Sequence, residues 1–139
     1  MIIADTGFFL ALANRNDAYH AVAINAYEAL AEPLVTTWPV ITETSHLLLN
    51  RLGRLSHQAF LESWKKGAFH VWAISEDAAG RICDLVDKYR DLPMDVADAS
   101  LVILAEHLGH GRILSTDQRD FKTYRWKNHR PFVNLLLSK

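Results

Sequence analysis

The chain has 139 residues, of which 50% are hydrophobic and 22% charged, and its formal net charge is −1. This composition excludes an intrinsically disordered chain, and the length predicts a single domain, residues 1–139, with its own hydrophobic core. The single cysteine excludes a framework of intrachain disulfides and favours a reducing, cytoplasmic environment. No stretch approaches the roughly 18 apolar residues of a membrane span, and Asp5 interrupts the N-terminal apolar run too early for a signal peptide.

Short apolar runs predict five strands along the chain, at residues 1–4, 34–38, 69–74, 112–115 and 132–137. Segments with helical periodicity lie between them, at residues 8–13, 18–31, 40–52, 55–66, 75–90 and 93–107. Strands that alternate with helices are typical of α/β proteins. We therefore predict a mostly parallel central sheet of four or five strands, flanked by helices on both faces.

Four residues receive local structural roles from this pattern. Ser56 and Ser75 are expected to cap the helices that follow them, and Pro93 is expected to open the helix that runs to residue 107. Cys83 lies among the apolar residues of the helix at 75–90, so we expect it to be a small core residue.

Two aspartates follow strands in the same way. Asp5 comes after Ile-Ile-Ala, and Asp117 comes after Ile-Leu-Ser-Thr. In a parallel sheet both carboxylates emerge at the carboxyl edge, where α/β proteins bind their ligands. They lie close together only if their strands are neighbours where the strand order reverses, which the sequence does not determine. An alternative role for Asp5 is to cap the helix that follows it.

Glu43 lies about one turn into a predicted helix that directly follows a strand, so it is also expected at the carboxyl edge. The alternative is a first-turn acid that stabilises the helix dipole. Glu43 and His46 match the Glu-x-x-His spacing of bundle di-metal sites, but the chain has no second copy of that spacing. We therefore expect His46 to line a cleft or to face solvent.

Asp98 borders the apolar stripe of the helix at residues 93–107, and no lysine or arginine lies within a turn of it. Because a half-buried carboxylate without a partner is costly, a metal ion is the simplest compensation. Asp95 is expected near the third helical position, where stabilising the helix dipole is a sufficient role.

Four carboxylates from separate segments are thus candidates for one site: Asp5, Glu43, Asp98 and Asp117. Mg²⁺ and Mn²⁺ prefer such oxygen ligands. Zinc is not expected, because the chain has no Cys/His ligand spacing. In sites of this kind the cation activates a bound water and neutralises charge that develops on phosphorus.

These acids and their neighbours resemble the PIN-domain nuclease family, and in particular its VapC-type toxins. The resemblance covers nearly the whole chain, in the family's order, and rests on Asp5-Thr6, Glu43, Met94-Asp95-Val96-Ala97-Asp98-Ala99 and Ser115-Thr116-Asp117-Gln118-Arg119-Asp120-Phe121.

This resemblance implies a PIN-like fold and a metal-dependent ribonuclease that hydrolyses RNA phosphodiester bonds by metal-activated water. The catalytic metal ligands, around one or two Mg²⁺ or Mn²⁺ ions, would be Asp5, Glu43, Asp98 and Asp117. Asp95 and Asp120 would be accessory acids, and Thr6 and Thr116 would position water or ligands. It also implies a homodimer and inhibition by a cognate antitoxin whose C-terminal segment occupies the cleft.

Charge and aromatic residues near the C-terminus fit a polyanionic substrate. Residues 109–139 carry seven Lys or Arg against two Asp, a charge of +5 that leaves −6 for the rest of the chain. Within them, residues 119–130 interleave cations with aromatic rings, a pattern that suits single-stranded RNA. The alternative is a solvated loop with its aromatics folded inward, as we expect for Phe121.

Two other α/β classes fit less well. A receiver domain needs paired acids after its first strand, an aspartate after its third and a late Lys-Pro, whereas only Asp5 is present here. A phosphatase with an Asp-x-Asp nucleophile fits equally poorly, because residue 7 is glycine. A housekeeping RNA-processing nuclease, or an RNA-binding module with little turnover, would share the same acids as a toxin. The sequence leaves that choice open.

Overall fold

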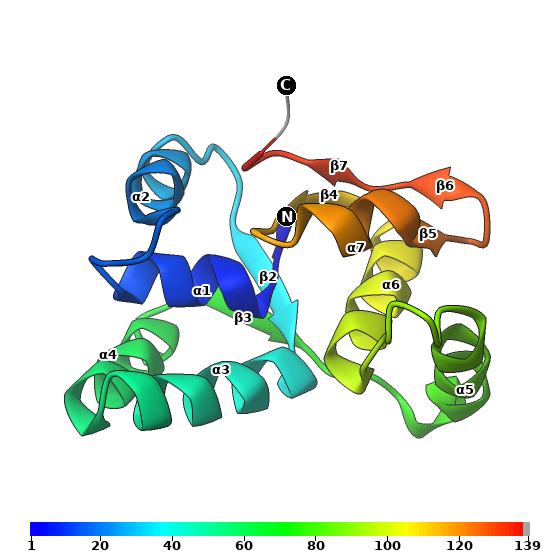
Figure 1. Ribbon diagram of the computed structural model, residues 1–139, viewed down its shortest axis with the longest axis horizontal. Coiled ribbons are helices and arrows are strands. Elements are labelled where there is room, and N and C mark those ends of the chain that lie inside the picture. Colours follow the sequence, from blue (N-terminus) through cyan, green and yellow to red (C-terminus); the bar gives the residue numbers. More distant parts are fainter. Residues whose placement is uncertain (138–139) are drawn as a thin grey trace.

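A five-stranded parallel sheet lies at the centre of the computed structural model, which describes residues 1–137 (Figure 1). The strand order is β3-β2-β1-β4-β7, and every neighbouring pair is parallel. These strands are β1 (Ile2–Ala4), β2 (Leu34–Thr37), β3 (Phe69–Trp72), β4 (Arg112–Leu114) and β7 (Val133–Asn134). The predicted α/β class and mostly parallel sheet are confirmed.

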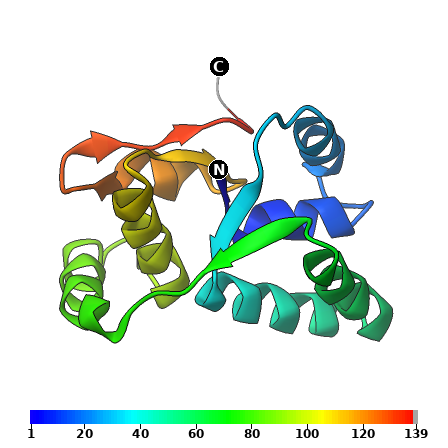
Figure 2. The ribbon, with the colours of Figure 1, turned by 180° about the vertical axis from the view of Figure 1, so that it is seen from behind.

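Helices cover both faces of this sheet. Those on one side are α1 (Thr6–Ala13), α2 (His20–Glu28), α3 (Trp38–Arg51) and α4 (Arg54–Lys65). Those on the other side are α5 (Ala79–Lys88), preceded by the 3₁₀ turn η1 (Glu76–Ala78), α6 (Val96–Leu108) and α7 (Gln118–Thr123). Figure 2 shows the same division from behind. A short antiparallel hairpin, β5 (Arg125–Trp126) and β6 (Arg130–Pro131), follows α7.

The central strand β1 and the helix α6 form the most buried part of the core. Every residue of β1 is buried, and α6 is apolar and buried over most of its length. A strand with β neighbours on both edges and helices on both faces has no polar side, which explains its unbroken apolar sequence. No helix within residues 1–137 is both long and apolar enough to span a membrane.

Some local expectations were wrong at the helix ends. Ser56 does not cap α4, which begins at Arg54 after Gly53, a residue with a φ of 96°. The expected helix opening at Pro93 begins instead at Val96, because the side chain of Asp95 caps it. Ser75 does cap, but it caps the 3₁₀ turn before α5. Cys83 is exposed on α5 and is not a core residue.

Gly7 lies in the first turn of α1 and brings that helix against the loop that follows β4. A Cβ atom at Gly7 would lie only 2.0 Å from Oγ1 of Thr116. Only a residue without a side chain therefore allows this approach. The contact matters for function because the segments around Gly7 and Thr116 carry Asp5 and Asp117.

We expect Gly7→Ala to destabilise the protein by roughly 1–3 kcal/mol, because the added methyl group must push the two segments apart. The matched control is Gly80→Ala, since Gly80 lies in α5 with no atom near its missing Cβ. That change is expected to stabilise the protein by about 0.5–1 kcal/mol through better helix propensity. Urea unfolding of both variants measures the two effects, and equal effects would contradict the close contact at Gly7.

Candidate functional site

The strands that carry Asp5 and Asp117 are neighbours in the sheet. β1 pairs with β4, with Ile3 opposite Ile113. The strand order reverses between these two strands, since the chain proceeds from β1 to β2 and β3 on one side and places β4 and β7 on the other. Such a reversal opens a crevice at the carboxyl edge of the sheet. Both aspartates therefore lie at the point where an α/β sheet binds its ligand.

A pocket of about 260 Å³ opens at this edge, and six carboxylates line it. The structure brings together the four candidate acids and the two accessory acids: Asp5, Glu43, Asp95, Asp98, Asp117 and Asp120. Thr6 also lines the pocket, whereas Thr116 is not among the lining residues. His46 lies outside the pocket, exposed in an adjoining groove, in agreement with the role expected for it.

Three of these acids cap helices whose N-termini meet at the pocket. Oδ1 of Asp5 accepts a hydrogen bond from the Phe8 amide (2.9 Å) at the start of α1. In the same way Asp95 caps α6 and Asp117 caps α7, with amide-to-Oδ1 distances of 2.8 and 3.1 Å. Each cap fixes the orientation of its carboxylate and places it at the positive end of a helix dipole.

Side-chain hydroxyl groups orient three of the carboxylates. Thr6 donates to Oε1 of Glu43 (2.5 Å), which links α1 to α3. Ser115 donates to Oδ2 of Asp5, so both oxygens of that carboxylate are bonded.

The third hydroxyl group belongs to Tyr124, which donates to Oδ2 of Asp98 (3.1 Å) from a fully buried position. Sequence reasoning missed this bond and the one from Ser115. In the sequence Ser115 ends a strand and begins one of the motifs of the family resemblance, and Tyr124 is one ring of the pattern at residues 119–130. Neither position indicates a hydrogen bond to a carboxylate.

Burial and mutual repulsion make the pocket a poor place for so many negative charges. Burial raises the pKa of Asp5 to about 6 against the opposing bonds from Ser115 and Phe8, with a smaller contribution from nearby carboxylates. Burial and the neighbouring Asp95 raise the pKa of Asp98 to about 7. Burial also raises the pKa values of Glu43 and Asp117. These shifts indicate a site whose ionised form needs a compensating cation.

The donor chemistry of the pocket fits a hard divalent cation, because all its ionisable ligands are oxygens. No three acidic, histidine or cysteine side chains among residues 1–137 are already arranged to hold a metal ion. The arginine nearest the acids, Arg119, donates from Nε to Asp120 (3.1 Å), but its side chain is 75% exposed.

The aromatic and basic segment at residues 119–130 has a different arrangement from the one expected for base stacking. Phe121, Tyr124 and Trp126 are all buried, which matches the alternative that these rings fold inward. His129 is the one ring of the four that is exposed. The side chains that this segment leaves exposed therefore include most of its cations and His129.

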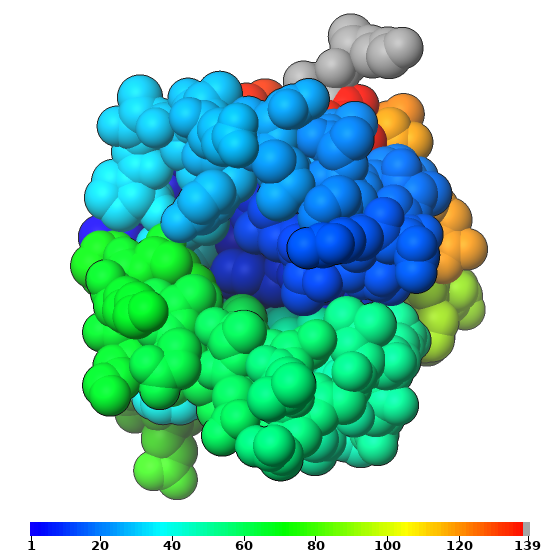
Figure 3. All heavy atoms as spheres, turned by 90° about the vertical axis from the view of Figure 1, so that its left-hand side faces the viewer, coloured from blue at the N-terminus to red at the C-terminus, as the bar shows by residue number. Residues whose placement is uncertain are grey.

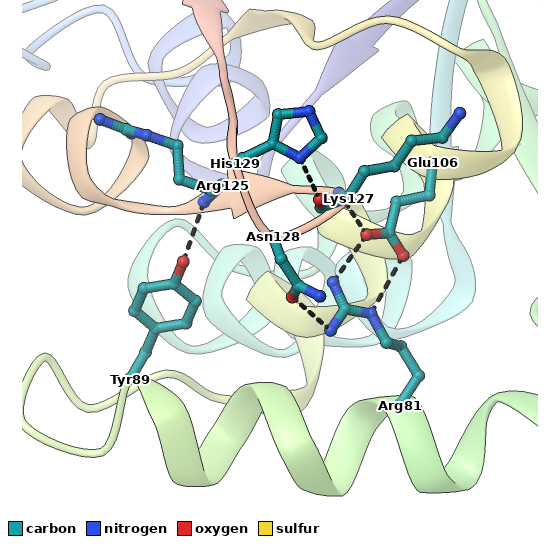
Figure 4. Close-up of polar contacts among 7 residues, drawn as sticks. All are labelled: Arg81, Tyr89, Glu106, Arg125, Lys127, Asn128 and His129. Atoms are coloured by element: carbon teal, nitrogen blue, oxygen red, sulfur yellow. Dashed lines mark hydrogen bonds and ion pairs between the residues drawn. The ribbon is translucent and has the colours of Figure 1, made fainter.

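A polar network fixes the turn of the β5–β6 hairpin to α5 and α6 (Figure 4). Arg81 pairs with Glu106 (2.7 Å) and donates to Oδ1 of Asn128 (2.9 Å), while the amide of Lys127 donates to Glu106 (2.5 Å). Three residues, Lys127 to His129, connect the two strands of the hairpin. Lys127 and Asn128 are the central residues of the turn at 126–129, and their φ values of 48° and 65° fit the primed turns that hairpins favour.

The network also reaches the acidic pocket through two tyrosines. At the start of the hairpin the Arg125 amide donates to the hydroxyl of Tyr89 (3.0 Å), whose ring packs edge-on against Tyr124. Anchoring the hairpin therefore also holds Tyr124 against Asp98.

A second hollow, of about 340 Å³, lies on another face, between α1, α2, α4 and β3. Figure 3 shows it as the recess between the blue segments above and the green segments below. Apolar and aromatic side chains, Phe9, Leu12, Ile24, Tyr27, Phe60 and Phe69 among them, make up most of its lining. Exposed apolar hollows of this kind are typical of protein contact surfaces.

A parallel sheet with an acidic pocket at its switch point is the architecture of PIN-domain proteins, and comparisons with known proteins agree. No protein-family model matches the chain. The chain is 30% identical over 127 residues to Ribonuclease VapC26 of Mycobacterium tuberculosis, covering 89% of this chain and 92% of that protein. It therefore belongs to the VapC-type toxins of the PIN-domain family.

The fold is also similar to a solved structure. The crystal structure of Mycobacterium tuberculosis VapC20, described as a toxin that cleaves the sarcin–ricin loop, superposes with a TM-score of 0.79. The two chains are 21% identical, and the match covers 86% of this chain and 92% of that one. The likeness confirms the PIN-like fold.

We expect Tyr124→Phe to raise the pKa of Asp98 above its value of about 7, because the hydroxyl group that stabilises the ionised carboxylate is lost. Carboxyl-carbon NMR titration measures this pKa directly. Tyr27→Phe is the control, since Tyr27 is 39% exposed and is not among the residues that line the acidic pocket. A pKa that stays constant or falls in Tyr124→Phe would contradict the assigned role of this hydroxyl group.

Between about pH 4 and pH 7 the raised pKa of Asp98 should make the free energy of unfolding fall as the pH rises. Over this range the folded protein retains a proton on Asp98 that the unfolded chain, with a pKa near 3.8, has lost. Asp98→Asn removes this contribution. Over that range, the unfolding free energy of the variant should therefore fall by on the order of 1–3 kcal/mol less than that of the unmodified protein. Urea unfolding of both proteins across the range is the test, and identical pH dependences would refute it.

Proposed function

We propose that the protein is a Mg²⁺- or Mn²⁺-dependent ribonuclease and the toxin of a VapBC-type toxin–antitoxin pair. The observation that carries this proposal is the convergence of six carboxylates on one pocket at the switch point of the sheet. Three of them are helix N-caps, two lie in the first turns of α6 and α7, and Glu43 comes from α3. Membership of the VapC-type toxins supports RNA as the substrate, and it favours a toxin over a housekeeping nuclease.

In this proposal Asp5, Glu43, Asp98 and Asp117 hold the cation, and Asp95 and Asp120 are accessory acids. When bound, the cation would lower the pKa of a water molecule and neutralise negative charge on the scissile phosphate. The protein supplies the orientation of its ligands. Ser115 and the Phe8 amide hold both oxygens of Asp5, while Thr6 and Tyr124 hold Glu43 and Asp98 through hydroxyl donors.

The lining of the pocket favours water as the nucleophile. Among residues 1–137 the pocket has no serine, cysteine or histidine in its lining, and its polar side chains are six carboxylates and Thr6. Cys83 is exposed on α5, and His46 lies in the adjoining groove. Covalent catalysis through a Ser–His or Cys–His pair therefore has no suitable residues here.

We further propose that an antitoxin encoded with this protein inhibits it, and that the toxin acts in the cytoplasm as a homodimer. Of the similar proteins, VapC26 is described as a ribonuclease and VapC20 as a toxin. The exposed apolar hollow between α1, α2 and α4 supports a protein partner, because such surface is costly to leave in water.

The proposal predicts that the protein cleaves a structured RNA pool in Mg²⁺ or Mn²⁺ and not in chelator. Asp98→Asn should lower the cleavage rate on the order of a hundredfold or more, since even outer-shell partners of metal ligands contribute 10–100-fold. The substitution keeps an oxygen for the Tyr124 hydroxyl group and removes the charge. Denaturing gel electrophoresis of end-labelled RNA measures the rates.

Asp87→Asn is the matched control, because the Asp87 side chain is 81% exposed on α5 and, within residues 1–137, its only ion pair is with Arg90. It should cleave at the rate of the unmodified protein. Cleavage that survives the chelator would overturn the metal dependence. An unimpaired Asp98→Asn protein would remove Asp98 from the site.

A further inference from the structure

An open groove of about 730 Å³ adjoins the acidic pocket along α3 and the start of α6. Glu43, Asp95 and Ala97 line both hollows, so the groove and the pocket share a wall. A strand whose phosphate lies among the carboxylates must leave the pocket across its rim. This groove is a continuous exit on the side of α3.

Two exposed apolar side chains face this groove, and both are the first residues of helices. Trp38 begins α3 and is 47% exposed, and Val96 begins α6 and is 52% exposed. Exposed apolar groups gathered beside a polar site are typical of ligand contact surfaces. Trp38 is held in a T-shaped contact with Trp64, with ring centroids 5.1 Å apart. The contact fixes the indole in place while nearly half of the residue stays accessible.

We propose that this groove binds a nucleobase of single-stranded RNA, which stacks on the indole ring of Trp38 next to the phosphate in the acidic pocket. The inference rests on the proposed ribonuclease function, and it assigns a subsite for the base that flanks the cleaved bond. Glu43 follows Trp38 by five residues in α3, about 7.5 Å along the helix axis. The two residues are therefore about 1.4 turns apart along the helix, and both line the groove.

The charges of the groove favour a base over a phosphate. Its walls carry the acidic side chains Glu43 and Asp95, which disfavour a phosphate group, whereas a base is neutral and presents an aromatic face. Ile74 and Val96 provide apolar walls beside the indole. Bases in single-stranded RNA are bound by stacking on aromatic side chains and by hydrogen bonds to their edges.

Polar groups for the base edge are also present. Thr42 and His46 line the groove and are exposed, and the amide of Asn50 contacts the His46 ring (3.1 Å to Nε2). The Thr42 hydroxyl group and the imidazole ring can each donate or accept a hydrogen bond. The groove thus combines one aromatic platform with polar groups that can discriminate between bases.

The test compares Trp38→Ala and Trp38→Phe with the unmodified protein on a short oligoadenylate and on the same backbone carrying abasic spacers. Steady-state cleavage in Mg²⁺ should show a KM raised roughly 5- to 100-fold in Trp38→Ala with kcat little changed, as expected when stacking on one ring is lost. Trp38→Phe should restore most of the loss. Fluorescence anisotropy in chelator measures the affinity for oligoadenylate, which should be highest for the unmodified protein, lower for Trp38→Phe and lowest for Trp38→Ala. For the abasic strand, the unmodified protein and Trp38→Ala should bind equally.

Leu55→Ala is the control, because Leu55 is a 72% exposed apolar residue of α4 that does not line the groove. It should leave KM and affinity unchanged. If the unmodified protein cleaves RNA but Trp38→Ala matches it, the base subsite is wrong and the proposed function stands. If Trp38→Ala changes only the molecular mass in light scattering, the groove is an interface between copies and the proposal is overturned. If the unmodified protein neither cleaves nor binds RNA, both proposals are wrong.

Discussion

The arrangement of this molecule depends on holding like-charged carboxylates together in a partly buried pocket. Their repulsion and their burial raise the pKa values of four of them, so the pocket opposes its own assembly. Two features of the backbone counter that opposition. The parallel neighbours β1 and β4 end at the same edge, and α1, α6 and α7 begin there with aspartate caps. The helix dipoles offset part of the repulsion between the carboxylates. The repulsion that they do not offset would favour binding of the proposed cation.

The same constraint connects the pocket to distant parts of the chain. Asp98 is oriented by the buried hydroxyl group of Tyr124, and Tyr124 leads directly into the β5–β6 hairpin. The Arg81–Glu106 pair anchors that hairpin from α5 and α6. A surface ion pair contributes little stability by itself. The Arg81–Glu106 pair is partly buried, and Glu106 also accepts a hydrogen bond from the Lys127 amide. The effect of the pair is therefore to hold the hairpin, and with it Tyr124, in position beside the acidic pocket.

The strands, and the acids that follow them, could be predicted because both depend on local sequence. Apolar runs specify buried strands, and an acid after a strand lies at the edge wherever the strand is placed. The adjacency of β1 and β4 could not be predicted, because it depends on how the chain crosses the sheet between residues 72 and 112. Cys83 was misplaced because the apolar residues around it indicate a helix but not the side on which it lies. It precedes Leu85, the buried residue of α5, by two residues and therefore lies on the opposite side of the helix. The sequence could not decide between the two roles considered for the rings of residues 119–130, because burial, which distinguishes a core ring from an RNA-binding ring, is a property of the tertiary structure. Tyr124 and Trp126 prove to be buried.

Helix capping and metal binding first appeared as alternative roles for the acids, but the geometry makes them compatible. Asp95–Asp98 and Asp117–Asp120 share one local design, in which the amide three residues after the cap bonds to Oδ1 of the capping aspartate. Asp5 makes the same bond with the amide of Phe8, so the residue three positions after this cap is apolar and not a second acid. The cap bond engages only Oδ1, so at Asp95 and Asp117 it does not use Oδ2. Asparagine caps a helix about as well as aspartate but carries no charge, so replacing Asp117 by asparagine separates the two roles. Helix α7 keeps its start, and the pocket loses one charge.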